Sequence, residues 1–342
     1  MSDSCRNGRR AMMWAAAAFL AAAAAPPMRA DTPAPAPAAP VTAKAPDPST
    51  TKFGGYLQTE LNLNGAWAPP YQLQARRVRL TIDAKSRDRL DGRIMLALDR
   101  FEFSLKDLYV TAYSPSVGLR VGQYYVPFAE EVLLSDSKRE ALERAPIARY
   151  LWPGERDMGA TLTINPRTKR GASFAASVLS GNGPSRADNN AQKDLIFRYT
   201  QRFDEGRGMA YVAHQRGLFT DANGVSTARR YYGLGGTWRD KHAKWRFQGE
   251  GFAGDALGKP FLGGIARAVR YWDGGKHSVY AQLDYMDPDR NTANDTQAGP
   301  VVGYIRKLSP DTKVTFELNG RQNDGTAATD FAAGVRYQIE WD

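Results

Sequence analysis

The chain has 342 residues, 46 of them Lys or Arg and 36 Asp or Glu, and it carries a formal net charge of +10. No run of about eighteen apolar residues follows position 30, so membrane-spanning helices are excluded from the rest of the chain. Its basic residues are interspersed with acidic ones at strand spacing, which argues against a nucleic-acid partner.

The chain begins with a predicted secretory signal peptide, residues 1–30. Arg6, Arg9 and Arg10 precede an alanine-rich apolar run over 11–25, which is the order expected of such a signal. Residues 31–52 are rich in proline and alanine and predict an extended periplasmic linker. The one cysteine, Cys5, lies in the signal peptide, so no disulfide is expected in the mature chain.

The remaining residues, 53–342, predict a single all-β domain in which apolar and polar residues alternate. Val78, Leu80 and Ile82 alternate with Arg77 and Arg79, the period-two pattern of a strand with two different faces. Sixteen strands are expected, at 53–64, 72–83, 91–101, 104–114, 118–126, 157–165, 171–180, 193–203, 208–218, 228–239, 243–254, 261–272, 276–286, 297–308, 312–321 and 331–341. The pattern predicts an up-and-down antiparallel transmembrane β-barrel, which turns one face to lipid and the other to a lumen.

The last strand, 331–341, shows the pattern without interruption. Its apolar face begins at Phe331 and ends at Trp341. A membrane strand needs roughly 9–11 residues and carries aromatic residues at both interfaces. The outer membrane of a bacterial cell is therefore the expected location.

The connections between the predicted strands also favour a barrel, because from the eighth strand onward short and long ones alternate. The short ones are 204–207, 239–242, 273–275 and 309–311; the longer ones are 181–192, 218–228, 254–260, 287–296 and 321–330. An even number of strands places both chain ends on the short-turn side, which is expected to be periplasmic.

One connection, after the fifth strand, is about thirty residues long. Pro127 ends the strand because proline has no N–H for the ladder, and the connection continues to Arg156. Residues 137–145 have helix-forming composition, and Pro146 is expected to stop that helix. A loop of this length is usually functional, and we expect it to fold into the lumen and narrow it.

Three segments resemble a known family, the phosphate-selective porins O and P. They are Val-Gly-Gln-Tyr-Tyr-Val-Pro-Phe at 121–128 followed by Leu-Glu-Arg at 142–144, Gln-Ala-Arg-Arg-Val-Arg-Leu at 74–80, and Arg-Asp-Met-Gly-Ala at 156–160. The resemblance covers essentially all of 53–342. It implies a sixteen-stranded barrel, a third long loop that folds inward, a homotrimer, and basic residues that line the pore. The inward loop of this chain differs, because its acidic residues outnumber its basic ones.

The strand registers predict which charged residues face the lumen. Besides Arg93, Arg270, Lys313 and Arg336, the candidates for pore lining and anion binding are Arg77, Arg79, Arg120, Arg198, Arg202, Arg216, Lys244 and Arg246. The candidates on the constricting loop are Lys138, Arg139, Arg144 and Arg149. The expected acidic counterparts are Glu60, Asp83, Asp99, Asp107, Glu250, Asp284, Glu317 and Glu340. Three apolar residues, Leu179, Ile196 and Val212, also fall on this face.

For any one arginine, an ion pair that steadies the wall is as good an interpretation as an anion site. Arg77 and Arg79 are the preferred anion-binding candidates, because they match the basic cluster of the family and lie two residues apart on one face. A lipid-facing arginine at membrane depth would cost roughly 2–4 kcal/mol.

These features predict a passive diffusion pore for small hydrophilic solutes with a mild preference for anions of the phosphate type. The alternative is a non-conducting barrel that serves as an anchor or scaffold, with its lumen plugged by the long loop. An enzyme is not expected, because His214 is the one histidine predicted in the lumen and no serine motif accompanies it. No metal-ligand spacing or cofactor motif is found, and the expected partners are small anionic or polar solutes and outer-membrane lipid.

Overall fold

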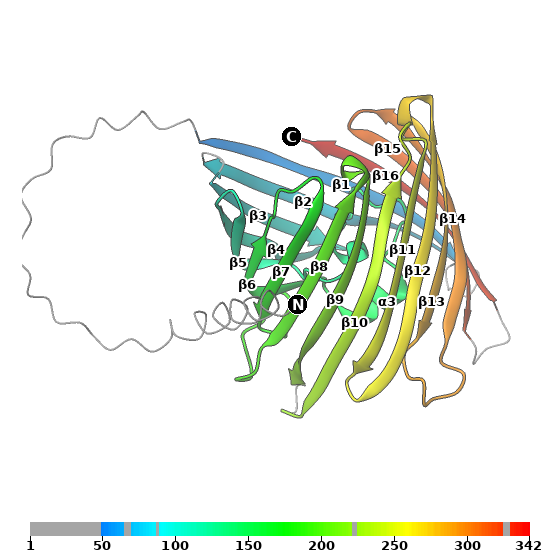
Figure 1. Ribbon diagram of the computed structural model, residues 1–342. Coiled ribbons are helices and arrows are strands. Elements are labelled where there is room, and N and C mark those ends of the chain that lie inside the picture. The colour runs from blue at the N-terminus through cyan, green and yellow to red at the C-terminus, as the bar shows by residue number, and fades with distance from the viewer. Residues whose placement is uncertain (1–48, 65–69, 87–88, 221–223, 324–328) are drawn as a thin grey trace, which may run out of the picture. The chain divides into compact units, whose positions relative to one another are not determined.

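The computed structural model describes residues 49–64, 70–86, 89–220, 224–323 and 329–342. The predicted signal peptide and most of the predicted linker lie outside these residues. The described chain forms sixteen strands that close into one barrel, with every neighbouring pair antiparallel (Figure 1). The predicted fold class is confirmed.

Most of the strands begin and end within about two residues of their predicted bounds. They are β1 (Thr50–Asn64), β2 (Tyr71–Ser86), β3 (Leu90–Asp99), β4 (Glu102–Tyr113), β5 (Val117–Tyr125), β6 (Arg156–Ile164), β7 (Gly171–Leu179), β8 (Asp194–Phe203), β9 (Gly208–Thr220), β10 (Ser226–Arg239), β11 (Trp245–Ala256), β12 (Lys259–Trp272), β13 (His277–Asp287), β14 (Gln297–Ser309), β15 (Thr312–Asn323) and β16 (Thr329–Trp341). The first strand starts inside the predicted linker, at Thr50.

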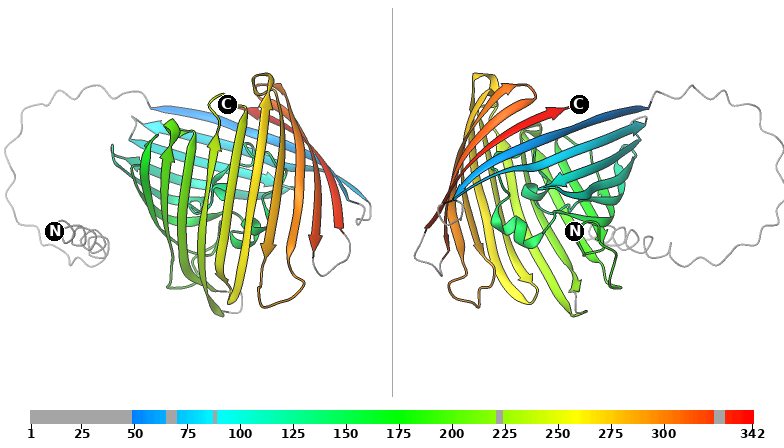
Figure 2. Two further views of the ribbon diagram at one scale, coloured as in Figure 1. Left: turned by 45° about the vertical axis from the view of Figure 1, so that its right-hand side comes forward. Right: turned by 180° about the vertical axis from the view of Figure 1, so that it is seen from behind.

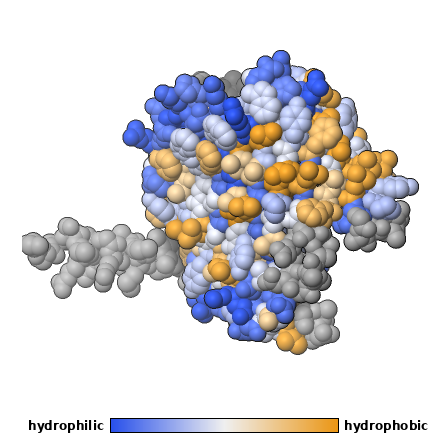
Figure 3. Space-filling view, turned by 90° about the vertical axis from the view of Figure 1, so that its right-hand side faces the viewer, coloured by the Kyte–Doolittle hydropathy of each residue, from blue (hydrophilic) through white to orange (hydrophobic). Residues whose placement is uncertain are grey.

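The outer face of the barrel is apolar. Leu80, Leu234 and Leu318 are 53%, 64% and 62% exposed, and hydrophobic side chains gather across the middle of the face seen in Figure 3. At the end where β8 meets β9 and β10 meets β11, outward aromatic rings stack on one another, as Trp238 and Phe247 do at 6.0 Å. An apolar belt with an aromatic margin on a closed barrel is the surface of a protein of the bacterial outer membrane. Within the described residues, no helix has the length and apolar character needed to cross a membrane.

The connections at this end, called the short-turn end here, include three-residue helical turns at Asp204–Gly206 and Asp273–Gly275. The opposite end is called the loop end. The long connection predicted there at 254–260 is wrong, because β11 and β12 continue until Leu257 and Gly258 alone join them. Both residues have positive φ, 56° and 79°, as a two-residue hairpin turn requires.

The connection between β5 and β6, residues 126–155, folds into the barrel and is called the inward loop (Figure 2). It contains two short helices, α2 (Glu130–Leu133) and α3 (Pro146–Leu151). The helix predicted at 137–145 is wrong, since helix α3 begins at Pro146 rather than ending there. Proline suits the first position of a helix, where its missing N–H would have no partner.

The hydrophobic core lies inside the barrel, between the inward loop and the wall of β8–β12. Phe128 and Ile147 of the loop are fully buried, and the ring of Trp152 lies 4.8 Å from that of Phe128. The wall supplies space for them at two glycines. A Cβ on Gly233 would lie 2.4 Å from the Phe128 ring, and one on Gly263 would lie 2.7 Å from Ile147.

Candidate functional site

The inward loop is held on one side by arginines of β2. A bulge interrupts the pairing of β2 with β1, so Arg77 pairs with Gln58, Ala75 pairs with Thr59, and Arg76 between them has no partner. Arg76 and Arg77 consequently both reach Glu143 of the loop, at 2.8 and 3.0 Å. A bulge that re-aims a side chain is a common feature near functional sites. Burial opposes ionisation of Glu143, but these two guanidinium groups outweigh it and lower its pKa to about 2.

Asp136 is the second anchor of the inward loop. Its carboxylate lies 3.5 Å from Arg77, 3.8 Å from Arg79 and 2.7 Å from Arg139. Burial alone would raise the pKa of Asp136, yet the surrounding arginines hold it well below its usual range. Arg79 also donates to Asp99 at 2.9 Å. The two preferred anion-binding candidates, Arg77 and Arg79, therefore face the lumen as predicted, but both are buried in ion pairs with the loop and the wall.

Two other strands of the wall hold the loop through its backbone. Glu250 of β11 accepts hydrogen bonds from the backbone N–H groups of Glu130 and Glu131, each at 2.8 Å. Glu317 of β15 accepts one from the N–H of Leu142 at 2.8 Å. Carboxylates of the wall thus satisfy donors that the irregular loop leaves unpaired.

A third set of contacts crosses the seam between β1 and β16. The amide of Gln58 donates to the carbonyl of Asp136 at 3.2 Å, and that of Gln338 donates to the carbonyl of Ser137 at 3.1 Å. Gln58 and Gln338 also bond each other at 2.7 Å. On the same seam, Arg336 donates to Glu60 at 2.7 Å.

The predicted loop cations fall into two groups. Arg139 and Arg144 are buried and bond the loop itself, Arg139 through the carbonyls of Ala141 and Leu142, and Arg144 through Asp136 at 3.2 Å. Arg149 lies exposed on α3, and Lys138 lies exposed where the lumen opens to the short-turn end. Arg139 and Arg144 stabilise the non-helical conformation of 134–145, which explains the failure of the helix prediction there.

The remaining pore-lining candidates differ in orientation and pairing. Arg198 bonds Glu130, and Arg246 bonds Glu140 at 2.5 Å. Arg120 faces the lumen, where it donates to Thr111 at 3.0 Å and lies over the ring of Tyr109 at 4.3 Å.

Arg202 is in register with the inward residues of β8. One of its Nη atoms is buried and has no hydrogen-bond partner in the described chain. Within the described chain, neither Arg120 nor Arg202 has a carboxylate at ion-pair distance. Lys244 lies in the turn before β11 rather than on a strand.

Arg216, predicted inside, points outward. On β9 the buried residues are Tyr211, Ala213 and Gln215, and the residues between them are on the outer face. Val212 (55% exposed) and His214, both predicted in the lumen, are likewise outside.

The same inversion occurs on β12, where Arg267 is inward and Arg270 outward. The predicted register of both strands is wrong because apolar lumen-facing residues, such as Phe261, pack in the core with the loop and resemble a lipid-facing stripe. Leu179 and Ile196 are inward, as predicted, and belong to the same core.

The structure also assigns inward residues that the sequence analysis missed, Arg76, Arg229 and Arg267. Arg267 lies 3.0 Å from Glu131, and Arg229 pairs with Asp194 at 2.5 Å. The inward orientation of Arg76 results from the bulge, and the alternation along the strand does not predict it. Arg267 could have been found by placing the smaller residues Gly264, Ala266 and Ala268 toward lipid.

One part of the lumen wall, β5–β8, has basic residues without acidic ones over most of its height. From the level of Arg120 to the short-turn end, its inward face carries Arg120, Arg198 and Arg202 among small and hydroxyl residues, namely Thr161, Thr163, Ser173, Ala175, Ser177 and Thr200. Thr161 bonds both Tyr124 and Ser177 at 2.8 Å. This face can offer hydroxyl and guanidinium donors to a solute.

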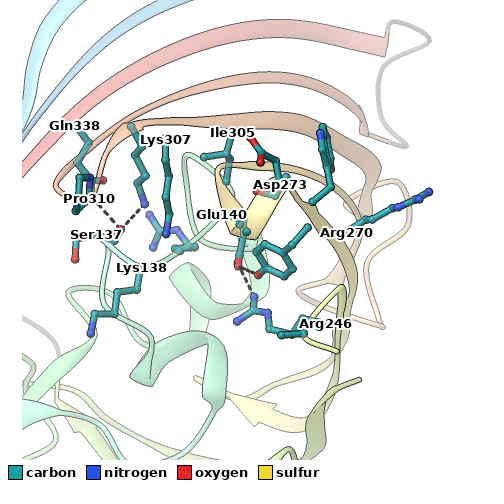
Figure 4. A pocket seen from close by; sticks show the side chains of 18 of the residues that line it. Ser137, Lys138, Glu140, Arg246, Arg270, Asp273, Ile305, Lys307, Pro310 and Gln338 are labelled. Carbon is teal, nitrogen blue, oxygen red and sulfur yellow. Dashed lines mark hydrogen bonds and ion pairs between the residues drawn. The ribbon is translucent and has the colours of Figure 1, made fainter. Parts of the chain in front are cut away.

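A cavity of about 1030 Å³ opens beneath the inward loop at the short-turn end, and we call it the basic vestibule. Eight Lys or Arg residues and four Asp or Glu residues line it. Lys307 and Lys313 are directly opposite each other on β14 and β15, and Lys138 projects from the loop (Figure 4). Arg270 extends away from this group, in agreement with its outward register. Like charges facing each other across a strand pair are unfavourable unless something of opposite charge is near.

Two of the histidines, His214 and His277, lie on the outer face of the barrel. His214 stacks on the outward Tyr232 at 4.7 Å, and His277 bonds Tyr304 at 2.6 Å in the outer aromatic margin. Among the described residues, no group of three or more His, Cys, Asp and Glu could hold a metal ion.

Solved structures of bacterial outer-membrane proteins share this architecture, although no family model and no curated protein matches the sequence. An anion-selective porin from Comamonas acidovorans aligns with a TM-score of 0.66 and 14% identity, over 86% of this chain and all of that one. The outer-membrane channel DcaP of Acinetobacter baumannii aligns at 0.60 and 12%, over 86% and 97% of the two chains. A loop-deletion mutant of OmpT, an outer membrane protein of Vibrio cholerae, aligns at 0.64 and 14%, over 86% and 100%. The chain therefore has the barrel fold of the bacterial outer-membrane porins.

Proposed function

We propose that this protein is a passive diffusion channel of the outer membrane, which admits small hydrophilic solutes with a mild preference for anions. The observation that carries the proposal is the basic vestibule, a cavity of about 1030 Å³ inside a closed barrel, in which the lining Lys and Arg residues outnumber the Asp and Glu residues eight to four. Charge on the walls of a water-filled lumen sets the selectivity of such a pore. The fold likeness to an anion-selective porin is consistent with this proposal.

The anion preference is assigned to cations that no carboxylate neutralises. Arg120 and Arg202 on the β5–β8 wall and Lys307 in the vestibule meet this condition among the described residues, whereas Arg77 and Arg79 are paired. In a hydrated lumen, attraction is screened over about 8–10 Å at physiological salt, so a paired charge contributes little to a passing ion. Weak selectivity follows, with phosphate-like anions favoured by guanidinium donors. Membership in the phosphate-selective porins O and P and a homotrimeric assembly belong to the same proposal.

The second candidate function is a non-conducting barrel used as an anchor or scaffold. It is favoured by the number of contacts that fix the inward loop, which bonds or packs against β1, β2, β8, β11, β12, β15 and β16. A loop held on opposite walls could close the lumen as well as narrow it.

Planar-bilayer recording distinguishes the two functions. A channel gives discrete conductance steps. In a salt gradient across the bilayer, the sign of its reversal potential should indicate a preference for anions. Purified, heat-modifiable barrel that inserts but stays silent would instead support the scaffold.

Two matched variants test which charges determine the preference. Arg202→Gln with Lys307→Gln removes two lumen charges that hold no part of the loop, and the reversal potential should move toward cations. Arg216→Gln with Arg306→Gln removes the same charge from the outer face and should leave the reversal potential unchanged. Equal effects of the two variants would contradict the assignment.

A further inference from the structure

We propose that Arg216 and Arg230, on the outer face of β9 and β10, form a binding site for the phosphorylated headgroup of a lipid in the outer leaflet. The proposal does not depend on conduction. It begins from the register, in which Arg216 and Arg230 are directly opposite partners. Both are exposed and alternate with inward residues, Gln215 and Tyr231 among them.

The two guanidinium groups are on the same face, and neither forms an ion pair with a carboxylate of the described chain. Asp255 is opposite Arg230 on the other side, on β11. No ion pair within 4.0 Å joins Asp255 or any other described carboxylate to either arginine. Like charges directly opposite each other on one face destabilise a strand pair, so this arrangement is stable where an anion lies between them.

The height of the pair matches the level of lipid headgroups. On β10, Trp238 belongs to the aromatic margin at the short-turn end, and Arg230 is eight residues before it. At about 3.3 Å per residue and a tilt of about 40°, these residues are separated by roughly 20 Å along the barrel axis, close to the ~25 Å height of an apolar band. Because an arginine side chain extends beyond its Cα, the guanidinium groups of the pair lie at the membrane interface opposite the aromatic margin.

The residues beneath the pair fit the same position. Tyr232 is 51% exposed and stacks on His214 at 4.7 Å, as expected of rings at a membrane interface. Below them, Val212 and Leu234 are 55% and 64% exposed and apolar. Acyl chains would lie on these residues while the headgroup phosphate meets the two arginines, whose planar donors suit phosphate oxygens.

Native mass spectrometry of the detergent-purified barrel, with bis-phosphorylated lipid A as the probe, tests this site. The wild type should retain one lipid A, and Arg216→Gln with Arg230→Gln should weaken retention at least tenfold. The control variant, Arg270→Gln with Arg306→Gln, removes two outward arginines at the short-turn end and should behave as the wild type. Heat-modifiable migration establishes that each variant is folded.

Two further measurements keep the test decisive. Lipid A stripped of its phosphates should bind the wild type as weakly as the intact lipid binds the double variant, a comparison that needs no variant to fold. Inorganic phosphate in millimolar excess should not displace the lipid, since a free anion lacks the apolar contacts with Val212 and Leu234. Equal retention by wild type and double variant, phosphate-independent retention, or displacement by free phosphate would each overturn the proposal.

Discussion

Two sets of arginines face the same lumen and differ in what they bind. Arg76, Arg77 and Arg79 on β2 are paired with Glu143, Asp136 and Asp99. Arg120 and Arg202, on β5 and β8, have no carboxylate at ion-pair distance among the described residues. The difference shows that an inward register alone does not make an arginine a selectivity residue. The β2 set fixes the position of the constricting loop, and the β5–β8 set leaves its charge available to solutes.

The largest expected effect comes from reversing the charge of the paired set. Arg77→Glu with Arg79→Glu places carboxylates against Asp136 and Glu143, and breaking a buried ion pair costs about 3–5 kcal/mol. The inward loop should leave its site, so single-channel conductance should rise and protease should cleave within 126–155. Arg120→Glu with Arg202→Glu is the matched control and should change the reversal potential without releasing the loop. If both double variants change selectivity alone, the two sets do not differ as described.

A smaller effect is expected where the loop packs against the wall without charge. Gly263→Val puts a side chain where Ile147 lies, 2.7 Å from the new Cβ, and overpacking typically costs about 1–3 kcal/mol. Partial release of α3 should appear as added current noise and faster hydrogen exchange of its amides. Gly251→Val, on the neighbouring strand with nothing within 4 Å of a Cβ, should be silent. Identical behaviour of the two variants would show that the apolar contact does not hold the loop.

The smallest effect is expected on changing pH. The pKa of Glu143 is lowered to about 2 and that of Asp136 is also lowered, so their contribution to docking is complete above about pH 4.5. It is lost as pH falls toward 2, because protonation removes the partners of Arg76 and Arg77. Conductance should therefore rise as pH falls below about 4.5. Glu143→Gln should show a weaker response to acid in that range, and an unchanged response of this variant would contradict this account.

The barrel and its strand bounds could be predicted because alternation and turn composition are local properties of the sequence. The orientation of β9 and β12 could not be predicted in this way. Their residues Tyr211, Phe261 and Ile265 pack in the core with the inward loop and do not face lipid. The ion-pair partners of the lumen-facing arginines also could not be predicted from the sequence. Whether Arg77 meets a carboxylate depends on where the loop places Glu143, sixty-six residues later in the chain.

The contacts of Gln58 and Gln338 with Asp136 and Ser137 have a consequence for the order of assembly. The two glutamines belong to the first and last strands, and they come together only when β1 pairs with β16. The carbonyls of the loop can accept both amides only after that pairing, so the last step of loop docking follows closure of the sheet. Amide protection within 126–155 should accordingly appear late in refolding, after the strand ladders have formed, and a chain arrested before closure would leave this segment open to chaperones.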